Sequence, residues 1–212
     1  MRFLLIICLL SLILPFKLLA KELDLNIANY EHIRFDGLKP TVYSNEKEIL
    51  IAKVDESSSI LMMAFDQIQT IRSVSIEWQS VGDLKVKNHE HQISKKGDDA
   101  RFRIGLILSG KAPIIPFFAP TWVKKTKDIL NFPSDKMIYL ALGAEARRQW
   151  KSPYSDSIET IALEAKAIKS SWFKSQISFS ESKKIVGLWL FADGDDTKSK
   201  FVTKIRKLEF DQ

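Results

Sequence analysis

Short apolar segments separated by polar turns follow one another through most of this sequence. The clearest of them runs from Ser73 to Gln79, where Val74, Ile76 and Trp78 alternate with polar residues. Successive side chains of a β-strand point to opposite faces, so a period of two predicts a half-buried strand. A second segment, Arg101 to Leu108, has the same period and is expected to be a central strand of an antiparallel sheet.

Further strands are expected wherever such segments recur, at spacings of roughly 10 to 20 residues. They lie at residues 22–29, 48–54, 59–65, 136–143, 157–163, 172–179, 185–191 and 201–210. Only Thr121 to Leu130 has apolar residues at helical spacing, and Pro133 closes it off. The polar stretch from Gly82 to Lys96 is expected to be a long exposed loop. The sequence therefore predicts an all-β fold, an antiparallel β-sandwich or jelly roll of about ten strands with one short helix.

The first 20 residues have the pattern of a secretory signal peptide. Met1-Arg2 gives a positive start, Phe3 to Phe16 is almost wholly apolar, and Ala20 is a small residue suited to cleavage. An uncleaved anchor is the alternative, although about 14 apolar residues are fewer than the roughly 20 that span a bilayer. We expect a signal peptide at residues 1–20 and a single domain at residues 21–212, with no membrane span after cleavage.

The composition indicates the cellular compartment and excludes one class of partner. Cys8 is the only cysteine, so cleavage leaves a domain that forms no disulfide and is held by its core. The chain is 45% hydrophobic, which is enough for one sizeable core. Its net charge of +6 is scattered and includes no dense basic run, so a nucleic-acid partner is not expected. Export to the bacterial periplasm, or secretion, fits these features best.

Two acidic turns lie at the ends of predicted strands. If those strands are neighbours, the carboxylates converge and can bind a hard cation such as calcium, which takes six to eight oxygen ligands. The alternative is structural, because Asp side chains often accept hydrogen bonds from the backbone of their own turns. The candidate ligand-binding residues at the first turn are Asp98, Asp99 and Arg101, and the candidate metal ligands at the second are Asp193, Asp195 and Asp196.

Trp150 and Tyr154 lie in a polar stretch, from Arg147 to Asp156, where an aromatic ring has little reason to be buried. Exposed aromatic rings can stack on the apolar faces of sugar rings. These two residues are therefore candidates for an aromatic sugar-binding platform, although such rings also commonly cover the edge of a sandwich.

Several of these features together resemble a bacterial family known as domain of unknown function number 3047. The matching residues are Phe35-Asp36, Glu77-Trp78, Lys96 to Arg101, Ile138 to Leu140, Trp172, Gly187 and Asp193 to Thr197. The resemblance covers about residues 30 to 210. It implies an exported β-sandwich protein and assigns no activity.

Three functions remain open from the sequence. The leading hypothesis is a non-catalytic module that binds carbohydrate or another component of the cell envelope, and no catalytic residue is assigned. The alternatives are a polysaccharide hydrolase that uses the two acidic turns, and an envelope protein that offers only an interaction surface. Convergence of the acidic turns to about 5–10 Å would favour the hydrolase or the metal site, because acid and base must face each other across a sugar.

Overall fold

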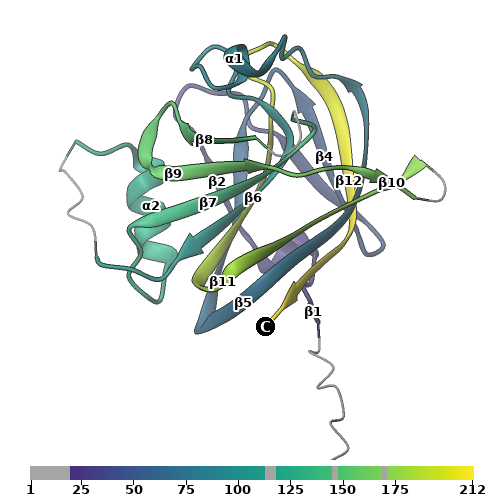
Figure 1. Ribbon diagram of the computed structural model, residues 1–212. Coiled ribbons are helices and arrows are strands. Elements are labelled where there is room, and N and C mark those ends of the chain that lie inside the picture. Colours follow the sequence, from purple (N-terminus) through teal and green to yellow (C-terminus); the bar gives the residue numbers. More distant parts are fainter. Residues whose placement is uncertain (1–19, 113–117, 145–147, 169–170) are drawn as a thin grey trace, which may run out of the picture.

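The computed structural model describes residues 20–112, 118–144, 148–168 and 171–212, so most of the predicted signal peptide lies outside the described residues. Within the described part of the chain, twelve strands form one sheet (Figure 1). They are β1 (Lys21–Glu22), β2 (Glu31–Arg34), β3 (Val42–Glu46), β4 (Ile49–Asp55), β5 (Ser59–Asp83), β6 (Ala100–Leu108), β7 (Lys136–Leu142), β8 (Gln149–Ser152), β9 (Ser155–Ala162), β10 (Lys166–Ala167), β11 (Phe173–Asp193) and β12 (Lys200–Asp211). The predicted all-β class is confirmed.

The sheet is folded over on itself because two of its strands are long and bent. The order of pairing along the main path is β3-β4-β12-β5-β11-β6-β7-β9-β8. The second half of β5 pairs with β12 and the first half of β11, whereas its first half pairs with β2 and the second half of β11. Register shifts between Ser178 and Lys183 and between Ile185 and Gly187 interrupt the pairing of β5 with β11. Such irregularities bend strands, and here they separate two layers.

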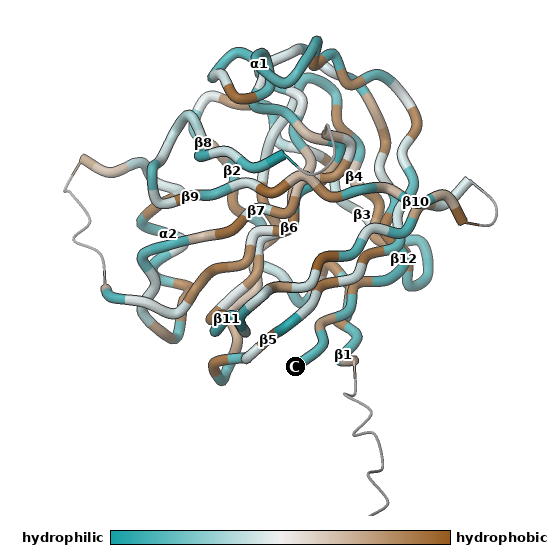
Figure 2. Tube along the Cα trace, viewed as in Figure 1, coloured by the Kyte–Doolittle hydropathy of each residue, from teal (hydrophilic) through white to brown (hydrophobic). Residues whose placement is uncertain are grey.

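The main hydrophobic core lies between these layers. It joins side chains of β4 and β12 to those of β6 and β7, which are far apart in the order of pairing. The hydroxyl of Thr203 on β12 also donates to the carbonyl of Arg101 on β6, at 2.8 Å, across the two layers. Figure 2 shows hydrophobic residues along the middle of β6 and β7 and mainly hydrophilic residues around the short helix α1 (His89–Gln92). The architecture is thus a sandwich made from a single continuous sheet.

A second hydrophobic cluster covers the opposite face of the layer that contains β6. Its buried members include Ile107, Tyr139, Trp189 and Phe191, and the helix α2 (Thr121–Ile129) packs on it through partly buried Trp122. The strand β6 is therefore buried on both faces, in agreement with its predicted central place. The predicted helix at Thr121–Leu130 is confirmed.

Several local expectations were wrong. The segments 59–65 and 73–79 belong to the single strand β5, and 172–179 and 185–191 both lie in or next to β11, because a strand can cross a bend without a turn. Residues 22–29 contain only the end of β1 and a 3-10 helix at Ile27–Asn29. The predicted loop at 82–96 contains α1, in which Gln92 is buried. One strand pair, β7 with β9, is parallel. Among the described residues, no helix has the length and apolar character needed to cross a membrane.

Candidate functional site

The two acidic turns meet where β6 begins and β11 ends. Ala100 on β6 pairs with Asp193 on β11, and the backbone N–H of Ala100 donates to a carboxylate oxygen of Asp193 at 2.9 Å. As a result, carboxylate oxygens of Asp99, Asp193 and Asp195 all lie within 4.8 Å of one another. The two acidic turns therefore converge, as the sequence allowed if β6 and β11 were neighbours.

A buried arginine, Arg103, lies at the centre of this site. Only 1% of its surface is exposed, and its guanidinium contacts Asp98 at 2.7 Å and Asp193 at 2.6 Å. It also donates to the backbone carbonyl of Asp98 at 2.9 Å and lies over the rings of Tyr139 and Phe191. Burial of a carboxylate is costly unless a cation and hydrogen bonds compensate it, and Arg103 provides both.

Sequence reasoning selected Arg101, but the structure places it elsewhere. Arg101 donates to the hydroxyl of Ser80 and the carbonyl of Gly82, and its guanidinium lies over the ring of Phe201. The register between β6 and β11 is irregular at this point, since Arg103 pairs with Phe191 but Ala100 with Asp193. This irregularity explains why two arginines separated by one residue do not reach the same site.

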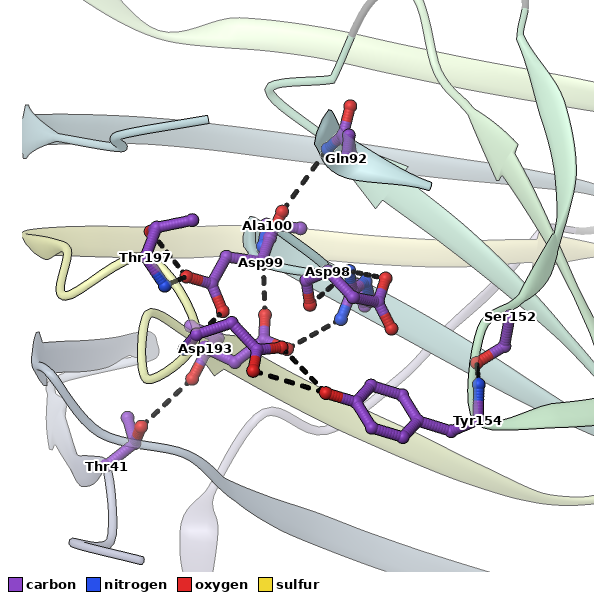
Figure 3. A network of polar contacts seen from close by, with 12 residues as sticks. Thr41, Gln92, Asp98, Asp99, Ala100, Ser152, Tyr154, Asp193 and Thr197 are labelled. Atoms are coloured by element: carbon purple, nitrogen blue, oxygen red, sulfur yellow. Dashed lines mark hydrogen bonds and ion pairs between the residues drawn. The ribbon is translucent and has the colours of Figure 1, made fainter. Parts of the chain in front are cut away.

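Asp99 fastens the second acidic turn to the first. Its buried carboxylate accepts hydrogen bonds from the backbone N–H groups of Thr197 at 2.7 Å and Asp196 at 3.3 Å, and from the Thr197 hydroxyl. The side chain of Gln92 donates to the carbonyl of Asp99 at 3.2 Å. Figure 3 shows this network, in which Asp99 points toward Thr197 and away from Tyr154. Asp99 therefore has a structural role, because its carboxylate accepts hydrogen bonds from the backbone of a turn.

Tyr154 lies at the opposite side of the acidic turns. Its hydroxyl, which has one proton to donate, lies 3.0 and 3.2 Å from the two carboxylate oxygens of Asp196 and 3.1 Å from the backbone carbonyl oxygen of Lys95. Figure 3 shows the ring of Tyr154 pointing toward the acidic turns. The side chain is 57% exposed, and Lys95 lies over its ring. Tyr154 is thus an exposed aromatic ring next to the acidic turns.

The expectation that Trp150 is an exposed partner of Tyr154 was wrong. Trp150 lies on β8, is only 9% exposed, and clusters with Ala100, Ala141 and Ala162. The ring of His89 in α1 packs edge-on against it with ring centroids 5.4 Å apart. The residues around Trp150 in the sequence are polar, so they did not predict that its ring packs against alanine side chains of other strands.

An open cavity of about 340 Å³ adjoins the acidic turns. Aromatic rings of Phe35, Trp122, Tyr139, Tyr154, Trp189 and Phe191 line it together with the polar residues Asp36, Ser58, Asp98, Arg103, Ser152, Asp193, Asp195 and Asp196. Two donors on lining residues, the indole N–H of Trp189 and the Nε–H of Arg103, are buried and have no hydrogen-bond partner among the described residues. Buried donors are almost always paired, so these two N–H groups are exceptions within an otherwise well-paired network.

A second cavity of about 460 Å³ shares three lining residues, Trp122, Ile158 and Trp189, with the first. It lies between α2 and the sheet and is lined mainly by apolar side chains such as Ile107, Leu130, Phe132 and Met137. The two cavities therefore adjoin each other at these three side chains.

Four carboxyl groups at the cavity, those of Asp98, Asp193, Asp195 and Asp196, have a raised pKa. Burial raises the pKa of Asp98, Asp193 and Asp195, and the neighbouring carboxylates raise it further, although Arg103 opposes the shift. Burial, followed by the charge of Asp195, raises the pKa of Asp196 to about 6. Burial and the charge of Asp196 also raise the pKa of Tyr154. The carboxyl groups are therefore crowded, and Arg103 balances their mutual repulsion only in part.

Calcium fits this donor set poorly. The three converging carboxylates are Asp99, Asp193 and Asp195, and Asp196 of the predicted set is bound to Tyr154 instead. Both oxygens of Asp99 and both of Asp193 already accept hydrogen bonds from the protein, and the Arg103 cation lies next to Asp193. A calcium ion needs six to eight oxygens, and few lone pairs remain for it.

No family model matches the sequence, and no curated protein matches it. Among solved structures, the carbohydrate recognition domain of Emp47p is similar over 87% of this chain and 88% of that chain, with 12% identity and a TM-score of 0.30. The similarity to domain of unknown function number 3047 stays a prediction.

Proposed function

We propose that this protein is a non-catalytic module that binds carbohydrate in the cavity beside the acidic turns. The observation that carries the proposal is the lining of that cavity, which combines six aromatic rings with carboxylates and Arg103. Sugars offer both an apolar ring face and hydroxyl groups that donate and accept hydrogen bonds, so they match a cavity that is lined by both kinds of residue.

The contacts among the rings support this choice. Trp122 packs edge-on against both Phe35 and Trp189, with centroids 5.8 Å apart in each pair, and Tyr139 packs against Phe191 at 5.2 Å. Rings fixed by their neighbours lose little conformational entropy when a ligand stacks on them. The adjoining apolar cavity gives room for a ligand longer than one sugar ring. We also propose export to the periplasm or medium, where envelope polysaccharides occur.

The test is calorimetric titration of the mature domain with neutral, acetylated and amino oligosaccharides. If Tyr154 stacks on the ligand, Tyr154→Ala should weaken binding about tenfold, because roughly 1.4 kcal/mol is within the range for burying part of an aromatic side chain. Phe118→Ala removes a ring that is 88% exposed and outside the cavity lining, and it should leave affinity unchanged. Absence of binding to every sugar would contradict the proposal and favour a protein partner.

A glycoside hydrolase is the second candidate, because the acidic turns converge and the pKa of Asp196 is raised to about 6, which suits a general acid. Asp98, Asp99 and Asp193 are occupied in ion pairs and turn hydrogen bonds, however. That leaves Asp195 and Asp196, which are adjacent in one turn, whereas glycosidases place two carboxyl groups on opposite sides of the scissile bond. Release of reducing ends from oligosaccharides, abolished by Asp196→Asn, would establish the hydrolase.

A further inference from the structure

The charges that line the cavity are strongly unequal. Among the described lining residues, Asp36, Asp98, Asp193, Asp195 and Asp196 are acidic, and Arg103 is the one basic residue. The Arg103 guanidinium is already shared between Asp98 and Asp193. Asp36 is exposed and Asp196 is partly exposed, with the Asp196 carboxylate in contact with the Tyr154 hydroxyl. A ligand that enters this cavity therefore meets an excess of negative charge.

Aromatic rings line the cavity together with these carboxylates. Tyr139, Trp189 and Phe191 form one cluster on the outer face of the layer, and the guanidinium of Arg103 already lies 5.9 Å from the ring of Tyr139 and 5.4 Å from that of Phe191. Ring faces attract cations, and the attraction grows when the cation loses its water. Carboxylates and rings together favour an organic cation, which can contact both.

Resting on the proposed carbohydrate function, we infer that the ligand is an amino sugar whose amine is free and protonated, with its ammonium group beside Asp36 and Asp196. Its hydroxyl groups can donate to the carboxylates that line the cavity, and its ring faces can contact the aromatic rings. An N-acetyl group removes the positive charge, and a uronic acid adds a negative charge next to carboxylates. Both changes weaken binding, so the cavity selects by charge among sugars of similar shape.

A metal ion is the other source of positive charge, and the geometry disfavours it. The converging carboxylates are largely occupied by protein donors, and aromatic carbon atoms supply no ligands to a hard cation. A chelator distinguishes a metal ion from an ammonium group as the source of positive charge, because it removes the metal ion and leaves the ammonium group in place.

The experiment is calorimetric titration at pH 6.5 with four tetramers of matched length: β-1,4-linked glucosamine, N-acetylglucosamine, glucose and a uronic acid. The amines of the glucosamine tetramer are bases that take up protons in weakly acidic solution, whereas the N-acetyl groups of its counterpart are neutral amides. The glucosamine tetramer should bind at least tenfold more tightly than its acetylated counterpart, and the preference should shrink as sodium chloride is raised from 50 to 500 mM. Addition of EDTA should leave its affinity unchanged.

Asp196→Asn should reduce the preference for the free amine by about tenfold while leaving weak binding of the neutral tetramer intact. Asp36→Asn is a second variant at an exposed position, in case the first disturbs the turn. Asp66→Asn is the matched control, because it removes one carboxylate at an exposed position outside the cavity lining.

Equal or tighter binding of the acetylated or neutral tetramer would overturn this inference and leave the proposed function standing. Loss of glucosamine binding in EDTA would also overturn it, since a metal would then provide the charge. Failure of every sugar to bind would refute the proposed function and the inference together. Spermidine binding as tightly as the glucosamine tetramer would do the same, because the cavity would then recognise an amine without a sugar.

Discussion

Arg103 is a single side chain on which two buried carboxylates depend. It is fully buried, and its guanidinium contacts Asp98 and Asp193, which are themselves at most 7% exposed. If Arg103 is replaced by leucine, both carboxylates keep their desolvation cost and lose their compensating cation. Removal of one partner from a buried ion pair costs about 3–5 kcal/mol. We therefore expect Arg103→Leu to lower the free energy of unfolding by about this amount in urea denaturation.

The matched control is Arg206→Leu, which breaks a pair with Glu77 at a partly exposed position. An ion pair of this kind contributes at most about 1 kcal/mol. If the two variants lose equal amounts of unfolding free energy, the carboxylates near Arg103 become protonated or hydrated in Arg103→Leu and do not stay buried and charged. A shift of the Arg103→Leu transition toward higher stability at acid pH would reveal the protonation directly.

At the scale of an element, the centre of β6 supports the aromatic wall of the cavity. Gly105 pairs with Trp189 on β11 and with Tyr139 on β7, so a position without a side chain lies between two large rings. A Cβ atom added there would approach Trp189 Cβ to 2.9 Å and Tyr139 Cε1 to 3.1 Å. The rings can lie across the strand because glycine leaves this space open.

We expect Gly105→Ala to destabilise the fold by about 1–3 kcal/mol, as overpacking of a filled core does. It should also change the near-ultraviolet circular dichroism of the tryptophans and weaken sugar binding. Gly37→Ala is the comparison: its φ of 77° makes alanine unfavourable, but no atom lies within 4 Å of the added Cβ. The free energy of unfolding of Gly37→Ala should be lower by about 1 kcal/mol, and its near-ultraviolet circular dichroism should be that of the wild type. Unchanged spectra in both would mean that the rings do not depend on Gly105.

The sequence predicted best those strands whose alternation of apolar and polar residues is not interrupted by a bend. The segment 201–210 became β12 and 136–143 became β7, within one or two residues. The long strands were divided in the prediction, because polar residues at a bend look like those of a turn. β8 was missed, since Trp150 is covered by Ala100, Ala141 and Ala162, and such tertiary contacts leave no trace in the local sequence.

For the molecule as a whole, the sandwich and the acidic turns could be predicted, but the composition of the site could not. Convergence of Asp98 and Asp99 with Asp193 and Asp195 depends on β6 lying next to β11, and the sequence allowed this only as a condition. Arg103 was overlooked because an arginine within an apolar strand is easily taken for an outward-facing residue. The cavity combines rings from β7, β11, α2 and two loops, and residue patterns in one segment do not predict such combinations.

The crowded carboxyl groups should make the stability of the whole domain fall as pH rises through weakly acidic values. The pKa of Asp196 is raised from 3.8 to about 6 by burial and by Asp195, and those of Asp98, Asp193 and Asp195 move the same way. Between about pH 4 and 6 the folded state then holds more protons than the unfolded state, so each step up in pH favours unfolding. His32 acts in the opposite sense, because burial lowers its pKa and its contribution is lost as pH falls below 6.5.

A comparison of the wild type with Asp196→Asn removes the contribution of His32, because both proteins contain this histidine. The melting temperature of the wild type minus that of Asp196→Asn should decrease from pH 4 to pH 6 and become constant above about pH 7, because ionisation of Asp196 is then complete in both states. Asp66→Asn is the control for loss of an exposed carboxylate outside the cavity lining. A decline of the same size in that variant would mean that the effect does not come from the crowded carboxyl groups. A difference for Asp196→Asn that grows with pH would mean that the folded protein stabilises the charged carboxylate, and the repulsion among the carboxyl groups would then be fully balanced.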